Sequence, residues 1–142
     1  MITVVAAVIE RGDRRILIGQ RRRADTSPLK WEFPGGKLRD GEAPQEGLAR
    51  ALREELRAEL KSCVEIGRVR HSYAGGSDRL EIRFFATEIA EGEILPHCFA
   101  QIAWVLPKEL GDYDFLEANR ELIAQIATGK VKPGEILRDA KS

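Results

Sequence analysis

The clearest periodic pattern in the chain lies between residues 44 and 60, where apolar side chains recur every fourth residue. Leu48, Leu52, Leu56 and Leu60 fall on one face at helical spacing, with charged residues between them. The proline at position 44 is tolerated in the first turn of a helix, because its missing N–H needs no partner there. The pattern therefore predicts a helix that begins near residue 44 and buries one apolar stripe.

Two segments near the N-terminus have the composition of strands. Ile2 to Ile9 is a dense run of β-branched residues and alanine, which is typical of a central strand buried on both faces. Arg15 to Gln20 follows a turn signal at residues 11–13, so the two segments predict a hairpin. Residues 31–33 predict a further short strand.

The second half of the chain alternates between strand and helix patterns. Val64 to Tyr73 and Leu80 to Ile89 alternate between apolar and polar residues on either side of a glycine-rich stretch at 74–78, which predicts a second hairpin. Gln101 to Leu106 predicts another strand, and Asp114 to Thr128 has the spacing of a second helix.

The order of these elements predicts one domain. Residues 1–129 hold all the expected helices and strands, and no internal repeat is visible. Residues 130–142 form a charged segment that contains Pro133 and Gly134, and we expect this tail to be loosely held.

Composition narrows the range of partners. The 142 residues are 43% hydrophobic and 32% charged, as in a soluble globular domain with a real core. The net charge of zero argues against a general nucleic-acid or membrane surface, which would need excess basic residues. The apolar N-terminal run is too short for a signal peptide or a membrane span, so a cytoplasmic location is expected.

The two cysteines do not form a recognisable site. Cys63 and Cys98 are far apart in sequence, and neither belongs to a C-x-x-C pair or has a histidine at ligand spacing. We therefore expect two buried, reduced thiols.

The predicted helix also carries a group of carboxylates next to a glycine pair. Glu54 and Glu55 are adjacent, about 100° apart around the helix axis, so both can lean toward one shoulder. With backbone carbonyls of Gly35-Gly36 they would offer the oxygen ligands that suit Mg²⁺. The residue types alone also allow an ordinary solvated helix face.

The spacing of this stretch resembles the Nudix box, written G-x5-E-x7-R-E-U-x-E-E-x-G-U with U aliphatic. Gly36 is followed after five residues by Glu42, and after seven more by Arg50; Glu54 and Glu55 then match the final acidic pair. The resemblance extends to about Gly129 and points to a Nudix hydrolase of the MutT-like nucleotide pyrophosphohydrolase kind. It implies a Nudix-type α/β/α sandwich with a mixed β-sheet between helices.

The box departs from the pattern in several places. Ala51 replaces the glutamate expected directly after Arg50, and Arg57 replaces the glycine after the acidic pair. Without a glycine to end it, the helix is free to continue toward Lys61. The loop at residues 96–100, where many relatives carry one more glutamate, has no acidic residue, and His97 is expected to be a surface residue.

The resemblance implies a role for each matching residue. Glu54, Glu55 and the Gly36 carbonyl would bind the metal, Mg²⁺ or else Mn²⁺, and Arg50 would orient Glu54, so that Arg50, Glu54 and Glu55 form the catalytic set. The substrate would be contacted by three further residues, which are Arg21 at a phosphate and Phe33 and Asn119 at the base.

The implied reaction is Mg²⁺-dependent hydrolysis of a nucleoside triphosphate to monophosphate and pyrophosphate, slowed by Ala51. The partner would be a small nucleotide and not a nucleic-acid polymer or a membrane, with the protein a monomer or homodimer. Three alternatives stay open: a nucleotide-binding protein that has lost catalysis, a hydrolase of another nucleoside diphosphate derivative, and a DNA reader resembling the Nudix-like domain of adenine glycosylases. The zero net charge and the missing glycosylase domain weigh against the last.

Overall fold

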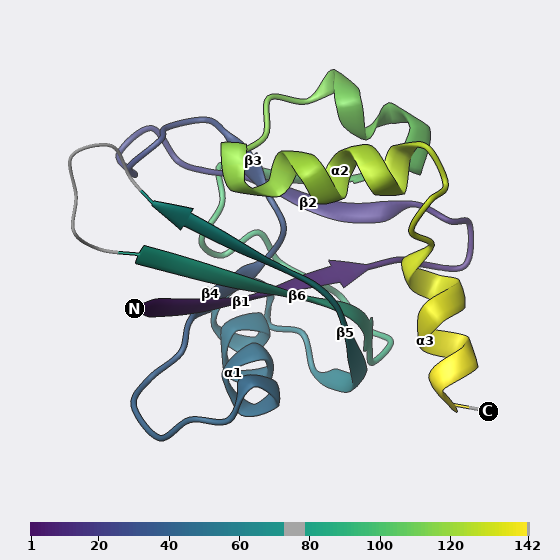
Figure 1. The fold of residues 1–142 in the computed structure, drawn as a ribbon, viewed down its shortest axis with the longest axis horizontal. Coiled ribbons are helices and arrows are strands. Elements are labelled where there is room, and N and C mark those ends of the chain that lie inside the picture. Colours follow the sequence, from purple (N-terminus) through teal and green to yellow (C-terminus); the bar gives the residue numbers. More distant parts are fainter. Residues whose placement is uncertain (73–78, 142) are drawn as a thin grey trace.

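The computed structural model describes residues 1–72 and 79–141, and their strands form two separate sheets (Figure 1). The elements are β1 (Ile2–Ile9), β2 (Ile16–Gln20), β3 (Trp31–Glu32), β4 (Gly35–Lys37), α1 (Pro44–Leu56), β5 (Leu60–Ser72), β6 (Arg79–Ile89), β7 (Gln101–Val105), α2 (Arg120–Ala127) and α3 (Pro133–Lys141), with 3-10 helices at Pro107–Asp112 and Glu117–Asn119.

The larger sheet has the strand order β4-β1-β6-β5 and the smaller has the order β3-β2-β7. The larger sheet is mixed, because β1 runs parallel to β6 while its other pairs are antiparallel. The predicted combination of a mixed sheet with helices is confirmed.

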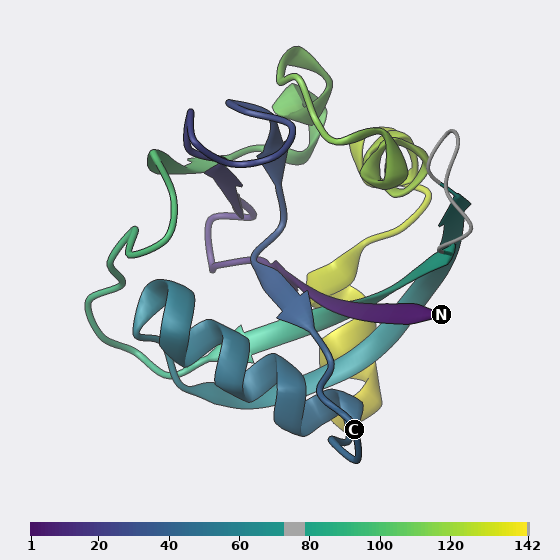
Figure 2. The ribbon, with the colours of Figure 1, turned by 90° about the vertical axis from the view of Figure 1, so that its left-hand side faces the viewer.

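Strand β1 separates two cores. Its side chains alternate, so Val5 and Ala7 pack toward α1 while Ala6 and Val8 pack toward the small sheet and α2. Figures 1 and 2 show α1 on one side of the large sheet and α2 on the other. The expected burial of this strand on both faces is thus confirmed.

The predicted hairpin between the first two strands is wrong. β1 and β2 lie in different sheets and share only an isolated bridge between Glu10 and Ile16. β2 instead pairs with β7, with Ile16 opposite Val105. The predicted turn is present, because the Arg14 N–H donates to the Arg11 carbonyl. After this turn, however, the chain enters the small sheet.

Helix α1 begins as predicted at Pro44 and ends earlier than expected. The predicted continuation toward Lys61 is wrong, because Arg57 turns into the left-handed conformation with φ 55° and ψ 34°. Its N–H donates to the carbonyls of Leu52 and Arg53, which closes the helix as a glycine cap would. The chain is then free to start β5 at Leu60.

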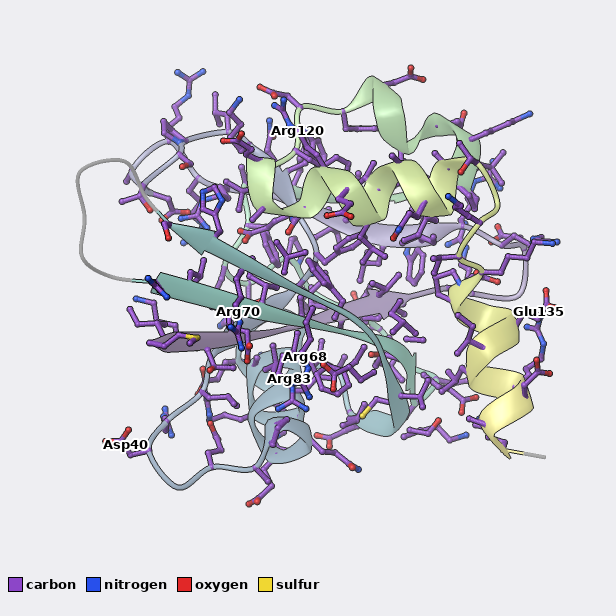
Figure 3. All side chains as sticks on the ribbon, in the orientation of Figure 1. Asp40, Arg68, Arg70, Arg83, Arg120 and Glu135 are labelled. Carbon is purple, nitrogen blue, oxygen red and sulfur yellow. The ribbon has the colours of Figure 1, made fainter. Side chains whose placement is uncertain are left out.

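The second hairpin is confirmed by the antiparallel pairing of β5 with β6, although the predicted turn at 74–78 lies outside the described residues. Charged side chains extend from these strands beside α1, including Arg68, Arg70 and Arg83 (Figure 3). Arg83 is anchored by an ion pair with Glu65, with Nη2 2.8 Å from a carboxylate oxygen.

The C-terminal third differs most from expectation. The helix predicted over 114–128 starts only at Arg120, after a 3-10 turn. The segment expected to be a loose tail is a helix, α3, whose Leu137 is buried beside the large sheet. Glu10 accepts a hydrogen bond from the Gly134 N–H at 3.2 Å, and Lys141 pairs with Glu88. In the described part of the chain no helix is long and apolar enough to cross a membrane.

Candidate functional site

The backbone of β4 presents its unpaired edge to helix α1. Leu38 donates to the Thr3 carbonyl and Ala7 donates to the Pro34 carbonyl, so the ladder bonds alternate residues of this segment to β1. Gly36, opposite Val5, belongs to the bonded set. The N–H and carbonyl groups of Gly35 and Lys37, which alternate with the bonded residues, therefore point away from β1.

Gly35 and Lys37 both form hydrogen bonds with side chains of helix α1. The Gly35 N–H donates to Glu55 Oε1 at 3.1 Å, and the Lys37 carbonyl accepts from Arg50 Nη2 at 2.9 Å. A side chain at Gly35 would collide with the backbone oxygen of Val5, so this close approach needs glycine. The same ladder leaves the Gly35 carbonyl directed toward α1.

Glu55 is the most perturbed acid in the site. Burial raises its pKa to about 8, a nearby Glu32 carboxylate adds to the effect, and the hydrogen bond from Gly35 opposes it. An acid held in this way keeps its proton at neutral pH unless a cation arrives. Perturbed carboxylates of this kind are frequent at functional sites.

A cavity of about 360 Å³ joins this carboxylate to residues from distant parts of the chain. It brings together five of the seven residues predicted for the site, namely Arg21, Phe33, Gly36, Glu55 and Asn119.

Asn119 and Phe33 are two lining residues of this cavity that are nearly inaccessible from outside. Asn119 is only 4% exposed, and its side-chain amide has no hydrogen-bond partner among residues 1–72 and 79–141. Phe33 is 3% exposed and packs edge-on against Phe84, with ring centroids 6.1 Å apart. An unpaired amide beside an aromatic ring can bind a planar polar group.

Arg21 reaches the cavity from the end of β2. Its guanidinium bonds to the carbonyl and hydroxyl of Thr26 and to Glu32, with Nη1 2.9 Å from Glu32 Oε2. Glu32 also lines the cavity, and burial is the main cause that raises its pKa. Sequence reasoning missed Glu32; its only signal was its position three residues before the glycine pair.

The other two predicted residues lie outside this cavity. Arg50 forms two short bonds with Glu42, at 2.8 and 2.9 Å, and a longer one with Glu54 at 3.3 Å. Arg50 thus orients mainly Glu42, whose pKa is lowered to about 2 by that contact. Glu42 matches the first acid of the box, and it was not among the residues predicted for the site.

Glu54 is 54% exposed and faces an open hollow shared with Arg53 and His97. His97 is exposed, as predicted. Cys98 is also exposed and Cys63 is half-buried, both as free thiols, so the prediction of two buried thiols is wrong.

Ala51 lies directly beneath the glycine strand. It is 2% exposed, and a Cβ built on Gly36 would approach the Ala51 Cβ to 3.4 Å. Within the described residues no three acidic, histidine or cysteine side chains form a preassembled metal cluster. The oxygen donors of the site are therefore few, but all are of the hard type that Mg²⁺ prefers.

The sequence comparisons agree with this geometry. The family model described as NUDIX domain matches residues 5–125. The chain belongs to the Nudix family.

Two curated relatives cover most of the chain. A Mycobacterium tuberculosis protein provisionally assigned as 8-oxo-dGTP diphosphatase 2 is 36% identical, over 87% of this chain and 86% of its own. The CTP pyrophosphohydrolase of Escherichia coli is 32% identical, over 95% of this chain and 98% of its own.

Among solved structures, one reported for MutT of Aliivibrio salmonicida and Vibrio cholerae superposes with a TM-score of 0.75. It is 26% identical and covers 90% of this chain and 98% of its own. Together these findings make the protein a MutT-like Nudix hydrolase.

Proposed function

We propose that this protein hydrolyses a nucleoside triphosphate to the monophosphate and pyrophosphate with Mg²⁺ as cofactor. The names of its relatives refer to 8-oxo-dGTP and CTP, which are both nucleoside triphosphates. The observation that carries the proposal is the unpaired amide of Asn119, a residue only 4% exposed, in the same cavity as Glu55.

The base would lie beside Asn119 and Phe33 in the cavity. Asn119 can offer a donor and an acceptor together, so it can pair with the edge of a base while Phe33 contacts its face. The phosphates would then extend toward Arg21 and Glu55, which line the same cavity. A guanidinium suits phosphate oxygens, which would replace some of the present bonds of Arg21.

The donor set fits a divalent cation. Glu55 offers a carboxylate oxygen beyond the one bonded to Gly35, and the register of β4 favours the Gly35 carbonyl over the predicted Gly36 carbonyl as a second ligand. Glu54, the other acid of the predicted pair, lies outside the cavity in the open hollow with His97. A bound Mg²⁺ would neutralise phosphate oxygens and lower the pKa of a coordinated water.

Substitution of Asn119 tests how the base is read. Asn119→Ala should lower kcat/KM for the preferred nucleotide by at least about tenfold and flatten the ranking among bases, since a site built for hydrogen bonding discriminates strongly. Asn119→Asp keeps the volume but loses the donor, and should change the ranking instead of abolishing it.

The assay is pyrophosphate release at fixed Mg²⁺ with a panel that includes CTP and 8-oxo-dGTP. An equal loss for every nucleotide in both variants would show that Asn119 supports the fold only.

A second candidate is a nucleotide-binding protein without catalysis. It is favoured by the absence, within the described residues, of a three-carboxylate metal cluster. Tight nucleotide binding without pyrophosphate release, at any Mg²⁺ or Mn²⁺ concentration, would support it over the hydrolase.

A further inference from the structure

The cavity contains a carboxylate that does not belong to the Nudix box. We propose that Glu32 is a metal-binding residue of this enzyme and that it supplies the ligand that Ala51 cannot provide. The inference rests on the proposed function, because it assigns a residue to the same Mg²⁺-dependent site.

Glu32 is held at the right place by backbone pairing. It lies on β3 opposite Gly19 of β2, and its side chain lines the same cavity as Glu55 and Gly35. The two carboxylates are close enough for the charge of Glu32 to influence Glu55. They therefore border one space from two different elements, Glu32 from strand β3 and Glu55 from helix α1.

In Glu32 and in Glu55, one carboxylate oxygen accepts a hydrogen bond and the other can still bind a cation. Glu32 Oε2 accepts from Arg21, while no hydrogen bond reaches Oε1 from residues 1–72 or 79–141. Glu55 Oε1 accepts from Gly35, and Oε2 is likewise without a donor in the part of the chain described. With the Gly35 carbonyl this makes three hard oxygen donors around one cavity, which suits Mg²⁺ completed by phosphate oxygens.

Ala51 does not itself line this cavity, but it lies next to a residue that does. Ala51 packs against Gly36, which itself lines the cavity, so a glutamate at 51 would approach from the α1 side. Glu32 approaches from the side of the small sheet. A carboxylate from either direction can complete the same ligand set, so the two positions should be functionally interchangeable.

This interchangeability gives the test. Mn²⁺ binding would be measured by electron paramagnetic resonance on the full chain. A non-hydrolysable nucleotide analogue would be present, in which a methylene group replaces the bridging oxygen at the bond that the enzyme cleaves. Glu32→Gln should weaken Mn²⁺ binding by about tenfold or more, and adding Ala51→Glu to that variant should restore most of the affinity. Glu121→Gln removes an exposed acid from α2 and serves as the matched control.

Pyrophosphate release provides the second readout. It should fall by about 10²-fold in Glu32→Gln and recover in the double variant. If Glu32 only holds Arg21, Glu32→Gln will raise KM for the nucleotide with unchanged Mn²⁺ affinity, and Ala51→Glu will restore nothing. That result would overturn the assignment.

The two proposals fail separately. If the parent protein releases no pyrophosphate from any triphosphate, the proposed activity is lost, while the Mn²⁺ measurements still decide the role of Glu32. Circular dichroism of each variant shows whether lost binding reflects lost folding.

Discussion

Replacing Glu55 with glutamine should make the metal-free protein more stable in alkaline solution. The folded protein holds the Glu55 proton up to a pKa of about 8, whereas the same group has a pKa of 4.5 when unperturbed. Between these values the native state binds more protons than the unfolded state, so the free energy of unfolding falls as pH rises. Glutamine keeps the hydrogen bond from Gly35 and has no proton to lose.

The magnitude follows from the two pKa values. Each pKa unit corresponds to about 1.4 kcal/mol, so the full difference gives an upper bound of about 5 kcal/mol. Water reaching the half-buried carboxylate screens part of this penalty, and we expect about 3 kcal/mol at pH 9. Since domains of this size are stable by about 5–15 kcal/mol, the effect is large.

The assay is urea unfolding of the parent, Glu55→Gln and Glu54→Gln at pH 5, 7 and 9 in the presence of a chelator. At pH 5 the parent and Glu55→Gln should have similar stability, because both carry a neutral side chain. At pH 9 only Glu55→Gln should be more stable. Glu54→Gln is the matched control, since the Glu54 side chain is 54% exposed on the adjacent residue.

Added Mg²⁺ should reverse the order at pH 9. A cation bound to the ionised Glu55 stabilises the folded parent but finds a poorer ligand in the glutamine variant. If parent and Glu55→Gln lose stability in parallel from pH 5 to pH 9, Glu55 is already ionised in the folded protein and the reasoning fails.

Two further changes test the fold. Arg57→Gly should stabilise the protein by about 1 kcal/mol, because the left-handed conformation strains any residue with a Cβ; the urea midpoint should rise, and a lower midpoint would contradict this. Leu137→Ala should destabilise it by about 2 kcal/mol, measured in the same way, while Ile136→Ala, at an exposed position, should change stability by less than about 0.5 kcal/mol. Equal effects of the last two would mean that α3 does not pack as described.

Local patterns predicted the parts of the fold that depend on neighbouring residues. The leucine spacing located α1 because helical periodicity is a property of consecutive residues. Strand pairing, in contrast, is not a property of consecutive residues. Nothing near residues 15–20 indicated that their partner would be β7. The turn at residues 11–13 favoured a hairpin between β1 and β2. The observed pairing instead depends on apolar residues from distant parts of the chain, which no local pattern reveals.

The candidate site shows the same division. Resemblance to the Nudix family identified Glu55 through the spaced box and Arg21 and Asn119 through their positions along the chain, and all three line one cavity. Glu32 was missed because its neighbours in space come from other elements. The left-handed Arg57 was missed because the propensity of a single residue is weak evidence against the demands of the next strand.

The parallel pairing of β1 and β6 also determines when the fold can form. Ile2 pairs with Leu80 and Ile9 with Thr87, so each residue of β1 lies 78 positions from its partner. Contacts this distant slow folding, because a long loop must close before they form. During synthesis from the N-terminus, the apolar first strand emerges early and has no parallel neighbour until more than half the chain has followed. Before β6 has been synthesised, the apolar surface of β1 is therefore most exposed to incorrect strand pairing. Chaperone binding would do most to prevent this mispairing during that interval.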